Sequence, residues 1–167
     1  FKRINKGIQT PTEEKKDIPK GLWYKSPTGK IVDTEELQKN FYVSPEDDYH
    51  VRIGSAEYFS ILFDNKFTEL DGNLSSKAPL KFVDMKKYTD RLKSARKITS
   101  QDDAVAIAKG KVQNTEVIVG AQDFRFIGGS FGAASGEAFI AGVQQAIENN
   151  KPLIFFSCSG GQRMMES

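Results

Sequence analysis

The stretch that decides the fold class is Leu153–Glu166, which reads LIFFSCSGGQRMME. Its first part, Leu153–Phe156, is an apolar run typical of a buried strand. A small-residue turn follows at Ser157–Gly161, and Gln162–Ser167 is predicted to open a helix. A strand that runs through a tight turn into a helix is the repeating unit of α/β proteins, so this stretch predicts an α/β layer.

The residues before this stretch extend the same pattern toward the N-terminus. Phe131–Asn149 is predicted to be a helix, because its apolar residues recur at the spacing of one helical face. Two β-rich runs, Ala104–Val112 and Glu116–Ala121, flank Gln113-Asn114-Thr115 and predict a hairpin. The order from Ala104 onward is therefore strand, strand, helix, strand and a second helix.

Shorter elements are predicted nearer the N-terminus. Helices are expected at Ser55–Phe63, with Ser55 as its cap, and at Met85–Lys97. Short strands are expected at Phe67–Asp71, Lys30–Val32 and Asn40–Val43, with Glu35–Lys39 either helical or part of a connection.

These elements suggest three parts: a mobile polar arm at 1–20, a small module at 21–54 and the α/β domain at 55–167.

Composition excludes several classes of protein. The chain has 167 residues and a formal net charge of +2, so charge alone indicates neither a nucleic-acid nor a membrane partner. Its single cysteine, Cys158, excludes an internal disulfide framework and a metal site made of several cysteines. No apolar run approaches the roughly 20 residues of a membrane span, and the first residues do not resemble a signal peptide.

The turn Ser159-Gly160-Gly161 is the first candidate site. Amide groups between a strand and a helix N-terminus are unpaired and lie at the positive end of the helix dipole. Because glycine lets a ligand approach the backbone, such a turn can stabilise an oxyanion on a carbonyl group. The spacing alone favours the simpler interpretation, in which the two glycines only make the turn tight.

The second candidate is Gly128–Gly132, which matches the G-x-S-x-G pattern of a nucleophile elbow around Ser130. That chemistry needs a histidine after the serine, but the one histidine of the chain, His50, lies far upstream. Close backbone packing or backbone donors are therefore the better interpretation of these glycines. Cys158 has no histidine nearby in sequence and is more often a small buried residue than a nucleophile.

Four segments together resemble the β subunits of bacterial-type acetyl-CoA carboxylase carboxyltransferase. They are Lys86–Ala95, with a Tyr-x-Asp-Arg-Leu pattern, Asp102–Gly110, Phe124–Gly132 with Gly-Gly-Ser-x-Gly, and Pro152–Glu166 with Ser-Gly-Gly-x-Arg-Met-x-Glu. They occur in order, and the resemblance covers about Ile18 to Ser167.

This resemblance implies an incomplete crotonase-like (spiral ββα) domain that binds acetyl-CoA. The reaction moves CO₂ from carboxybiotin to acetyl-CoA and makes malonyl-CoA for fatty acid synthesis. Gly160 and Gly161 would stabilise the thioester enolate, and Gly128, Gly129, Ser130 and Ser159 would contribute to the acyl-CoA pocket. The resemblance also implies a carboxyltransferase α subunit in an α₂β₂ assembly, a biotin carboxyl carrier protein that delivers carboxybiotin, and a biotin carboxylase. It places the chain in the bacterial cytoplasm, or alternatively in the plastid stroma.

The sequence departs from that family in its first module. The family has a zinc ribbon with two Cys-x-x-Cys pairs, whereas this chain has Ser26-Pro27-Thr28-Gly29 and Ser44-Pro45-Glu46-Asp47. Serine is a poor zinc ligand, so no bound zinc is expected and no metal site is predicted. We expect Trp23, Tyr24, Phe41 and Tyr42 to hold this ribbon-like module instead.

Two other functions stay open. Loss of the cysteines suggests a non-catalytic scaffold subunit derived from the family. A crotonase-class enzyme that acts on another acyl-CoA is the second alternative. Because the chain stops inside the predicted last helix, it is expected to be a fragment or one part of a split subunit.

Overall fold

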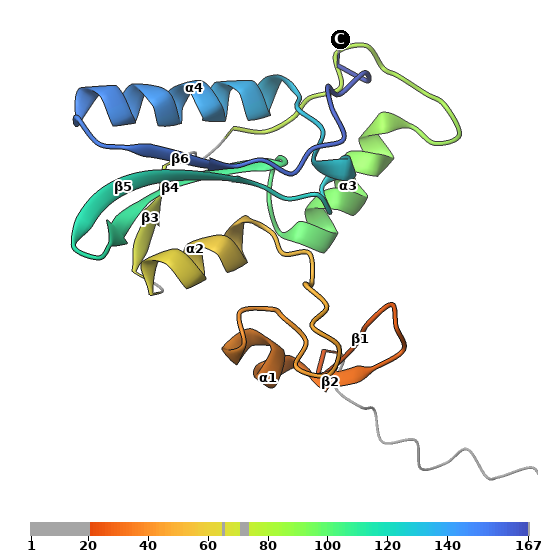
Figure 1. The fold of residues 1–167 in the computed structure, drawn as a ribbon. Helices are drawn as coiled ribbons and strands as arrows, with labels where there is room; N and C mark the ends of the chain where they lie inside the picture. Colours follow the sequence, from red (N-terminus) through yellow and green to blue (C-terminus); the bar gives the residue numbers. More distant parts are fainter. Residues whose placement is uncertain (1–20, 65, 71–73, 167) are drawn as a thin grey trace, which may run out of the picture. The chain divides into compact units, whose positions relative to one another are not determined.

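The computed structural model describes residues 21–64, 66–70 and 74–166 (Figure 1). The chain divides into two compact units between Arg52 and Ile53. The predicted three-part organisation, with a remnant of a zinc ribbon at 21–54, stays a prediction.

The described part of the first unit, residues 21–52, contains a short hairpin and one helix. Strands β1 (Trp23–Lys25) and β2 (Ile31–Asp33) pair antiparallel, and α1 (Thr34–Lys39) follows directly. The side chain of Asp33 caps α1 by accepting the N–H groups of Glu35 and Glu36. The predicted strand at Lys30–Val32 and helix at Glu35–Lys39 are thus confirmed.

Two expectations about the first unit are wrong. Asn40–Val43 is not a strand, because Phe41 and Tyr42 have positive φ angles of 52° and 62° and turn the chain. Trp23 and Phe41 do not hold the module together, since their side chains are 61% and 67% exposed.

The second unit contains a four-stranded sheet in the order β3-β4-β5-β6. Its strands are β3 (Phe67–Glu69), β4 (Val105–Val112), β5 (Thr115–Gln122) and β6 (Leu153–Phe156). The first three strands run antiparallel, and β6 pairs parallel with β5. The return of the chain through α4 (Ala133–Glu148) makes this parallel pairing possible.

Alternating residues of the sheet face different helices. Ala108 and Val119 pack on α2 (Ser55–Phe63), whereas Ile107 and Ile118 belong to the cluster that includes Ala138 of α4. The two helices therefore cover opposite faces of the sheet, as Figure 1 shows. The third helix, α3 (Tyr88–Thr99), packs through Tyr88 and Leu92 in a separate cluster.

The hairpin between β4 and β5 confirms its prediction with a tighter turn than expected. Val112 pairs with Thr115, so that only Gln113 and Asn114 form the turn, with φ angles of 46° and 68°. Positive φ at both central residues is the type I′ geometry whose twist matches that of the strands.

Several predicted boundaries shift. Helix α2 has the predicted bounds, but its cap is Gly54, whose N–H donates to the Glu57 carboxylate at 2.8 Å. Ser55 is the first helical residue and is buried. Helix α3 begins at Tyr88 rather than Met85.

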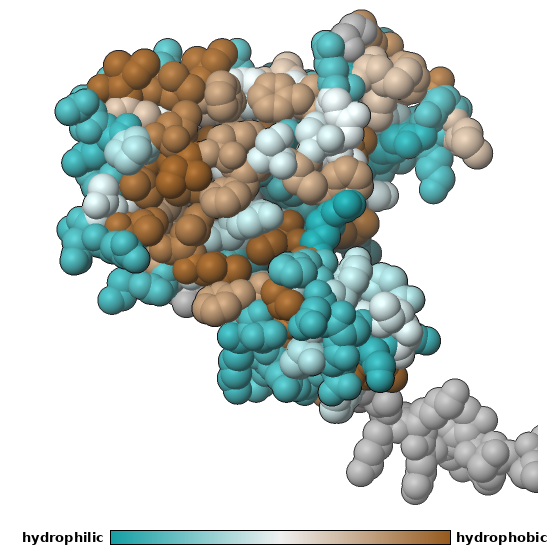
Figure 2. All heavy atoms as spheres, viewed as in Figure 1, coloured by the Kyte–Doolittle hydropathy of each residue, from teal (hydrophilic) through white to brown (hydrophobic). Residues whose placement is uncertain are grey.

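The last two elements differ more from their predictions. Strand β6 is only partly buried, because it is the edge strand of the described sheet, and Ile154 is 40% exposed. Figure 2 shows apolar side chains over α4 and β6, where Ile140 and Ile147 are also exposed. The helix predicted from Gln162 is absent from the described residues, where Met164–Glu166 form a turn instead.

Candidate functional site

The two glycine-rich segments that the sequence singled out separately lie together in the structure. The Gly160 N–H donates to the Gly128 carbonyl at 2.9 Å, and the Phe131 N–H donates to the Gly161 carbonyl at 2.9 Å. The Arg163 N–H in turn donates to the Phe131 carbonyl at 2.9 Å. These bonds join the loop after β5 to the turn after β6.

Gly129 shows why this contact requires glycine. Its φ is +63°, and a Cβ added there would lie 2.1 Å from the Cys158 carbonyl oxygen. No side chain fits at that distance, so the loop can approach the turn only at a glycine. Gly128 also has a positive φ, +65°, but a Cβ there would meet no atom within 4 Å.

Gln122, the last residue of β5, connects the same two segments through its side chain. Its side chain is 2% exposed. The Nε2 group donates to the Gly129 carbonyl at 3.1 Å, while Oε1 accepts from the Cys158 N–H at 3.1 Å and the Ser157 hydroxyl at 3.0 Å. One buried amide therefore holds both backbones, and the sequence did not predict this role.

Arg163 is the second connection, and it is 1% exposed. Its guanidinium forms a bidentate ion pair with Asp103, with Nη2–Oδ1 and Nη1–Oδ2 distances of 2.8 and 2.9 Å. The same guanidinium donates to the carbonyl of Ser130 at 2.7 Å and to its hydroxyl at 3.2 Å. Arg163 thereby fixes the Ser130 loop to the start of β4.

Four further polar side chains complete what we call the Arg163 network: Ser76, Tyr88, Ser135, which donates to Asp103, and Glu166. The Ser76 hydroxyl donates to Asp103 and accepts from Arg163 Nη1, and the Tyr88 hydroxyl donates to Glu166. Glu166 also accepts the Ala133 N–H at 2.8 Å, which places a carboxylate at the first turn of α4.

The network shifts the pKa values of its members. Burial alone would raise the pKa of Asp103, but hydrogen bonds from Arg163, Ser135 and Ser76 outweigh burial and lower it. Burial likewise opposes the lowered pKa of Glu166, which results from the Tyr88 hydroxyl and the Ala133 amide. Burial and the neighbouring Glu166 raise the pKa of Tyr88 to about 12. Both carboxylates are thus held ionised, and the phenol is held neutral.

Two cavities flank Glu166. One of about 500 Å³ is lined by Gly132, Gln162, Arg163 and neighbouring residues of α4. Another cavity, of about 440 Å³, is lined by Ala134 and Glu137 of α4 and by residues between Leu74 and Pro79, including Ser76. The first cavity adjoins the Gly160–Gly161 turn through Gln162.

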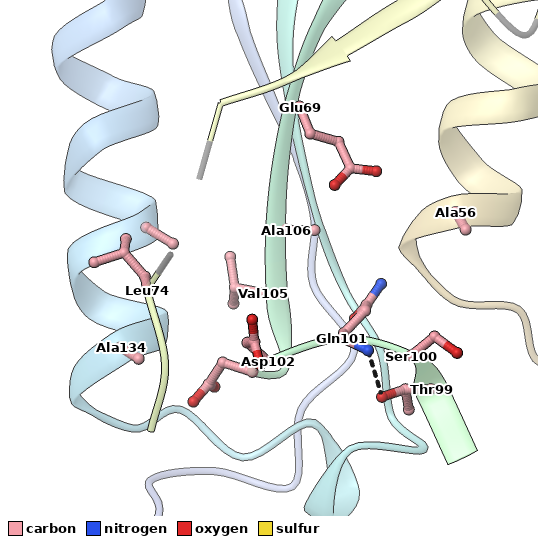
Figure 3. A pocket seen from close by; sticks show the side chains of 12 residues that line it. Ala56, Glu69, Leu74, Thr99, Ser100, Gln101, Asp102, Val105, Ala106 and Ala134 are labelled. Carbon is pink, nitrogen blue, oxygen red and sulfur yellow. Dashed lines mark hydrogen bonds between the residues drawn. The ribbon is translucent and has the colours of Figure 1, made fainter. Parts of the chain in front are cut away.

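A third cavity, of about 260 Å³, lies where β4 begins, and Asp103 lines it. Figure 3 shows Gln101 and Asp102 on one side of it and Leu74 and Ala134 on another. The backbone N–H of Gln101 donates to the Thr99 hydroxyl at 3.2 Å. Asp103 is engaged with Arg163, so this cavity borders the Arg163 network.

The Gly160–Gly161 turn is exposed, and its two amide groups have different partners. The Gly160 N–H is used within the protein, by the Gly128 carbonyl. The Gly161 N–H donates at 3.0 Å to the hydroxyl of the exposed Ser159, which in turn donates to the Gly161 carbonyl at 3.2 Å. Met164–Glu166, the last described residues, form a turn.

The other candidates are also accounted for. The Ser130 hydroxyl accepts from Arg163, and a guanidinium cannot act as the base of a nucleophile elbow. Cys158 is half-buried, with its amide on Gln122. His50 lies in the first unit, where it is exposed and forms a single bridge with Val43.

The segments that the sequence resemblance compares with two cysteine pairs carry oxygen donors. The Ser26 and Thr28 hydroxyls donate to the carboxylate of Asp47, and the buried Ser44 lies beside it. Structural zinc sites use thiolate and imidazole ligands, and neutral hydroxyls are not among them. These residues do not fit a structural zinc ion.

Most of the Arg163 network was not predicted as a site. Tyr88, Asp103 and Arg163 fall within the segments that carry the resemblance, but nothing in the sequence connects residues so far apart. The signal available was a polar residue in an apolar setting, such as Gln122 at the end of the run Val117–Ala121.

Comparison with known proteins agrees with the sequence resemblance. The carboxyl transferase domain family matches residues 80–167. The chain is 59% identical to the acetyl-coenzyme A carboxylase carboxyl transferase subunit beta of Christiangramia forsetii, which it matches over 100% of its own length and 59% of the relative's. The same named subunit of Amoebophilus asiaticus is 53% identical, with 60% of it covered. The chain therefore spans about 60% of the length of these relatives.

A solved structure of transcarboxylase 12S, described with methylmalonyl-coenzyme A and methylmalonic acid bound, has a similar fold. The TM-score is 0.55 over 70% of this chain and 21% of that one, at 24% identity. The predicted incomplete, crotonase-like α/β fold is thus confirmed. In the described residues, no helix has the length and apolar character needed to cross a membrane. The chain belongs to the carboxyl transferase domain family.

Proposed function

We propose that the chain is part of the β subunit of an acetyl-CoA carboxylase carboxyltransferase. This subunit binds acetyl-CoA and stabilises its thioester enolate while CO₂ passes from carboxybiotin to give malonyl-CoA. The names of the relatives support this proposal. The observation that carries it is the exposed Gly161 amide, whose turn is held by the close approach of the buried Gly129 and by the bond from Gly160 to Gly128.

Removal of a proton from the acetyl group puts negative charge on the thioester oxygen, and donors already in position lower the barrier. We assign the main donor role to Gly161, because its N–H bonds the hydroxyl of Ser159, an exposed side chain that a ligand could displace. Gly160 orients the turn through its bond to Gly128. A thioester oxygen would replace the Ser159 hydroxyl on this amide, so that Ser159 also contacts the substrate.

The acyl-CoA pocket would lie over this turn, next to the cavity that Gly132 and Gln162 line. We propose that Gly128, Gly129 and Ser130 hold the pocket in place rather than bind the substrate directly. Their polar groups already form hydrogen bonds within the protein, to backbone groups, to the Gln122 amide and to the Arg163 guanidinium. Glu166 is not suited to be the base, because its lowered pKa makes it a weak base and its bonds to Tyr88 and Ala133 occupy its oxygens.

The relatives are named as subunits, so a multi-subunit enzyme is implied. Within it we propose a carboxyltransferase α subunit that binds carboxybiotin in an α₂β₂ assembly, a biotin carboxyl carrier protein and a biotin carboxylase. No cofactor would be held by this chain itself. The relatives are bacterial, which supports the bacterial cytoplasm over the plastid stroma as the site of action.

The proposal is tested with the full-length protein and its cognate α subunit. Malonyl-CoA-dependent carboxylation of biocytin, the reverse reaction, reports the transfer. Gly161→Pro removes the donor N–H, and kcat is expected to fall by roughly 10²–10³-fold. Because Gly161 has φ of +117°, proline also strains the turn, and Gly161→Ala is the matched control that strains it but keeps the N–H.

A larger loss of kcat in Gly161→Pro than in Gly161→Ala, at equal assembly, supports the donor role. Wild-type turnover in Gly161→Pro contradicts it. If the assembled wild-type complex binds acetyl-CoA but turns nothing over, the scaffold function is favoured, and turnover of a longer acyl-CoA in preference to acetyl-CoA favours the other alternative.

A further inference from the structure

The first unit has few apolar residues with which to stabilise itself. Among residues 21–52, Val32 and Leu37 are the buried hydrophobic residues, at 3% and 2% exposure. Modules of this size usually need a metal ion, disulfides or another cross-link, because their cores are too small. This part of the chain has no cysteine, so a different connection must hold its turns together.

Two backbone turns take the places of the family's cysteine pairs. In the first, the Ser26 N–H donates to the Lys30 carbonyl at 2.8 Å and the Gly29 N–H donates to the Ser26 carbonyl at 2.9 Å. In the second, the Ser44 N–H donates to the Tyr49 carbonyl at 2.9 Å. Each turn is closed by its own backbone, but backbone bonds of this kind do not connect one turn to the other.

The side chain of Asp47 makes that connection. Its Oδ2 accepts the Ser26 hydroxyl at 2.7 Å and the Thr28 hydroxyl as well, across about twenty residues of sequence. Its Oδ1 lies 3.4 Å from the Tyr49 N–H in its own turn. Each hydroxyl has one hydrogen, so two donors converge on one carboxylate oxygen.

Two buried serines lie beside the Asp47 carboxylate, which is itself only partly buried. Ser26 is 3% exposed and Ser44 is 0% exposed. The Lys30 N–H donates to the Ser26 oxygen at 3.2 Å, which leaves the hydroxyl hydrogen for Asp47. The Ser44 hydroxyl makes no hydrogen bond of regular geometry with the described residues, although it lies beside Asp47 and stabilises its charge.

We propose that the Asp47 carboxylate takes the structural place of the zinc ion, binding Ser26 and Thr28 of the first turn and so holding the two turns together without a metal. The neighbouring hydroxyls of Ser44, Thr28 and Ser26 hold the pKa of Asp47 at about 2. The carboxylate therefore stays ionised, and able to accept both hydroxyls, throughout the range in which proteins are ordinarily handled.

The test compares two charge-removing substitutions in the full-length protein. Asp47→Asn removes the anionic acceptor, whereas Asp48→Asn removes an equal charge from the adjacent exposed residue, whose φ of 52° suits asparagine. Hydrogen exchange is followed by mass spectrometry on peptides from residues 21–52. Exchange in Asp47→Asn is expected to be at least roughly tenfold faster than in wild type, because hydrogen bonds to a charged group are lost. Asp48→Asn is expected to match the wild type.

A second measurement addresses the metal directly. Zinc is measured in protein purified without chelator, and exchange of the same peptides is then compared before and after treatment with a strong chelator. The proposal predicts unchanged exchange after chelation. It is overturned if chelation removes one zinc ion per chain and opens residues 21–52, or if Asp47→Asn exchanges no faster than Asp48→Asn. Neither measurement depends on carboxyltransferase activity, so a failure here is separate from a failure of the proposed function.

Discussion

The guanidinium of Arg163 and the carboxylate of Asp103 form a buried bidentate ion pair between residues 60 positions apart, with distances of 2.8 and 2.9 Å. Arg163 lies two residues after Gly161 of the exposed glycine turn, and Asp103 precedes β4. The pair therefore anchors the candidate site to the sheet, and through Ser130 it anchors the loop after β5 as well.

Asp103→Asn should be strongly destabilising. It removes the bidentate carboxylate from the buried guanidinium of Arg163 and leaves only the Glu166 carboxylate, at 3.2 Å from Nη1, as its counter-charge. Breaking a buried ion pair in this way typically costs about 3–5 kcal/mol. Urea unfolding followed by circular dichroism measures the change. Asp102→Asn is the control, because that carboxylate is 64% exposed and 3.7 Å from its partner Arg96, and a change of at most about 0.5 kcal/mol is expected. Equal effects of the two substitutions would show that the ion pair does not anchor the site.

Stability should fall in alkali because of Tyr88. Its pKa is about 12 in the folded protein, against 10.0 ordinarily, so the folded state keeps a proton that the unfolded state loses. This contribution is complete below pH 10 and is lost as pH rises from 10 to 12, at most about 2–3 kcal/mol.

Tyr88→Phe removes that titrating group. The free energy of unfolding of this variant, measured in urea at several pH values, should decline less between pH 10 and 12 than that of the wild type. Parallel declines of the two proteins would contradict a raised pKa at Tyr88.

Gly129→Ala should be much worse than Gly128→Ala. Both residues have positive φ, +63° and +65°, so alanine costs about 1–2 kcal/mol in backbone strain at either. Only at Gly129 does the added methyl group also collide with a backbone atom, the Cys158 carbonyl oxygen at 2.1 Å. The overpacking adds about 1–3 kcal/mol or more. Thermal unfolding of the two variants gives the difference, and equal melting temperatures would mean that the two segments are not in contact.

The sequence predicted elements well where a pattern is long or a turn is short. Helix α2 has its predicted bounds, and the β4–β5 hairpin forms where alternating residues flank Gln113 and Asn114. The pattern was too short at Gln162–Ser167, where a few residues do not distinguish a helix from a turn. It was misleading at Asn40–Val43, because aromatic residues favour strands but Phe41 and Tyr42 turn the chain.

The sequence predicted the two glycine segments of the candidate site but not the contact between them, and the reason is physical. A glycine pattern is local, so both glycine segments were recognised. The contact between them was not, because it depends on chain segments that the sheet brings together through the parallel pairing of β5 and β6. The residues that hold them there, Gln122 and Arg163, act at separations of up to 36 and 87 residues.

The last prediction concerns Gln122, whose single amide holds both glycine segments. Gln122→Met keeps the approximate volume but leaves the Gly129 carbonyl and the Cys158 N–H without their partner. Unsatisfied buried groups of this kind cost about 1–3 kcal/mol each, so a loss of roughly 2–4 kcal/mol in unfolding free energy is expected. Gln144→Met, on the exposed side of α4, should change it by no more than about 0.5 kcal/mol.

The Gln122→Met variant also distinguishes an effect on the position of the site from a loss of overall stability. At a temperature where Gln122→Met is fully folded and assembled with its α subunit, the turn that carries the Gly161 amide has lost its attachment to β5. The kcat of biocytin carboxylation should then fall by at least roughly tenfold, because a misplaced donor loses its effect on the transition state. The KM for malonyl-CoA should change less, since contacts to the remainder of the CoA do not depend on Gln122. An unchanged kcat in the folded variant would show that the turn holds its position without this amide.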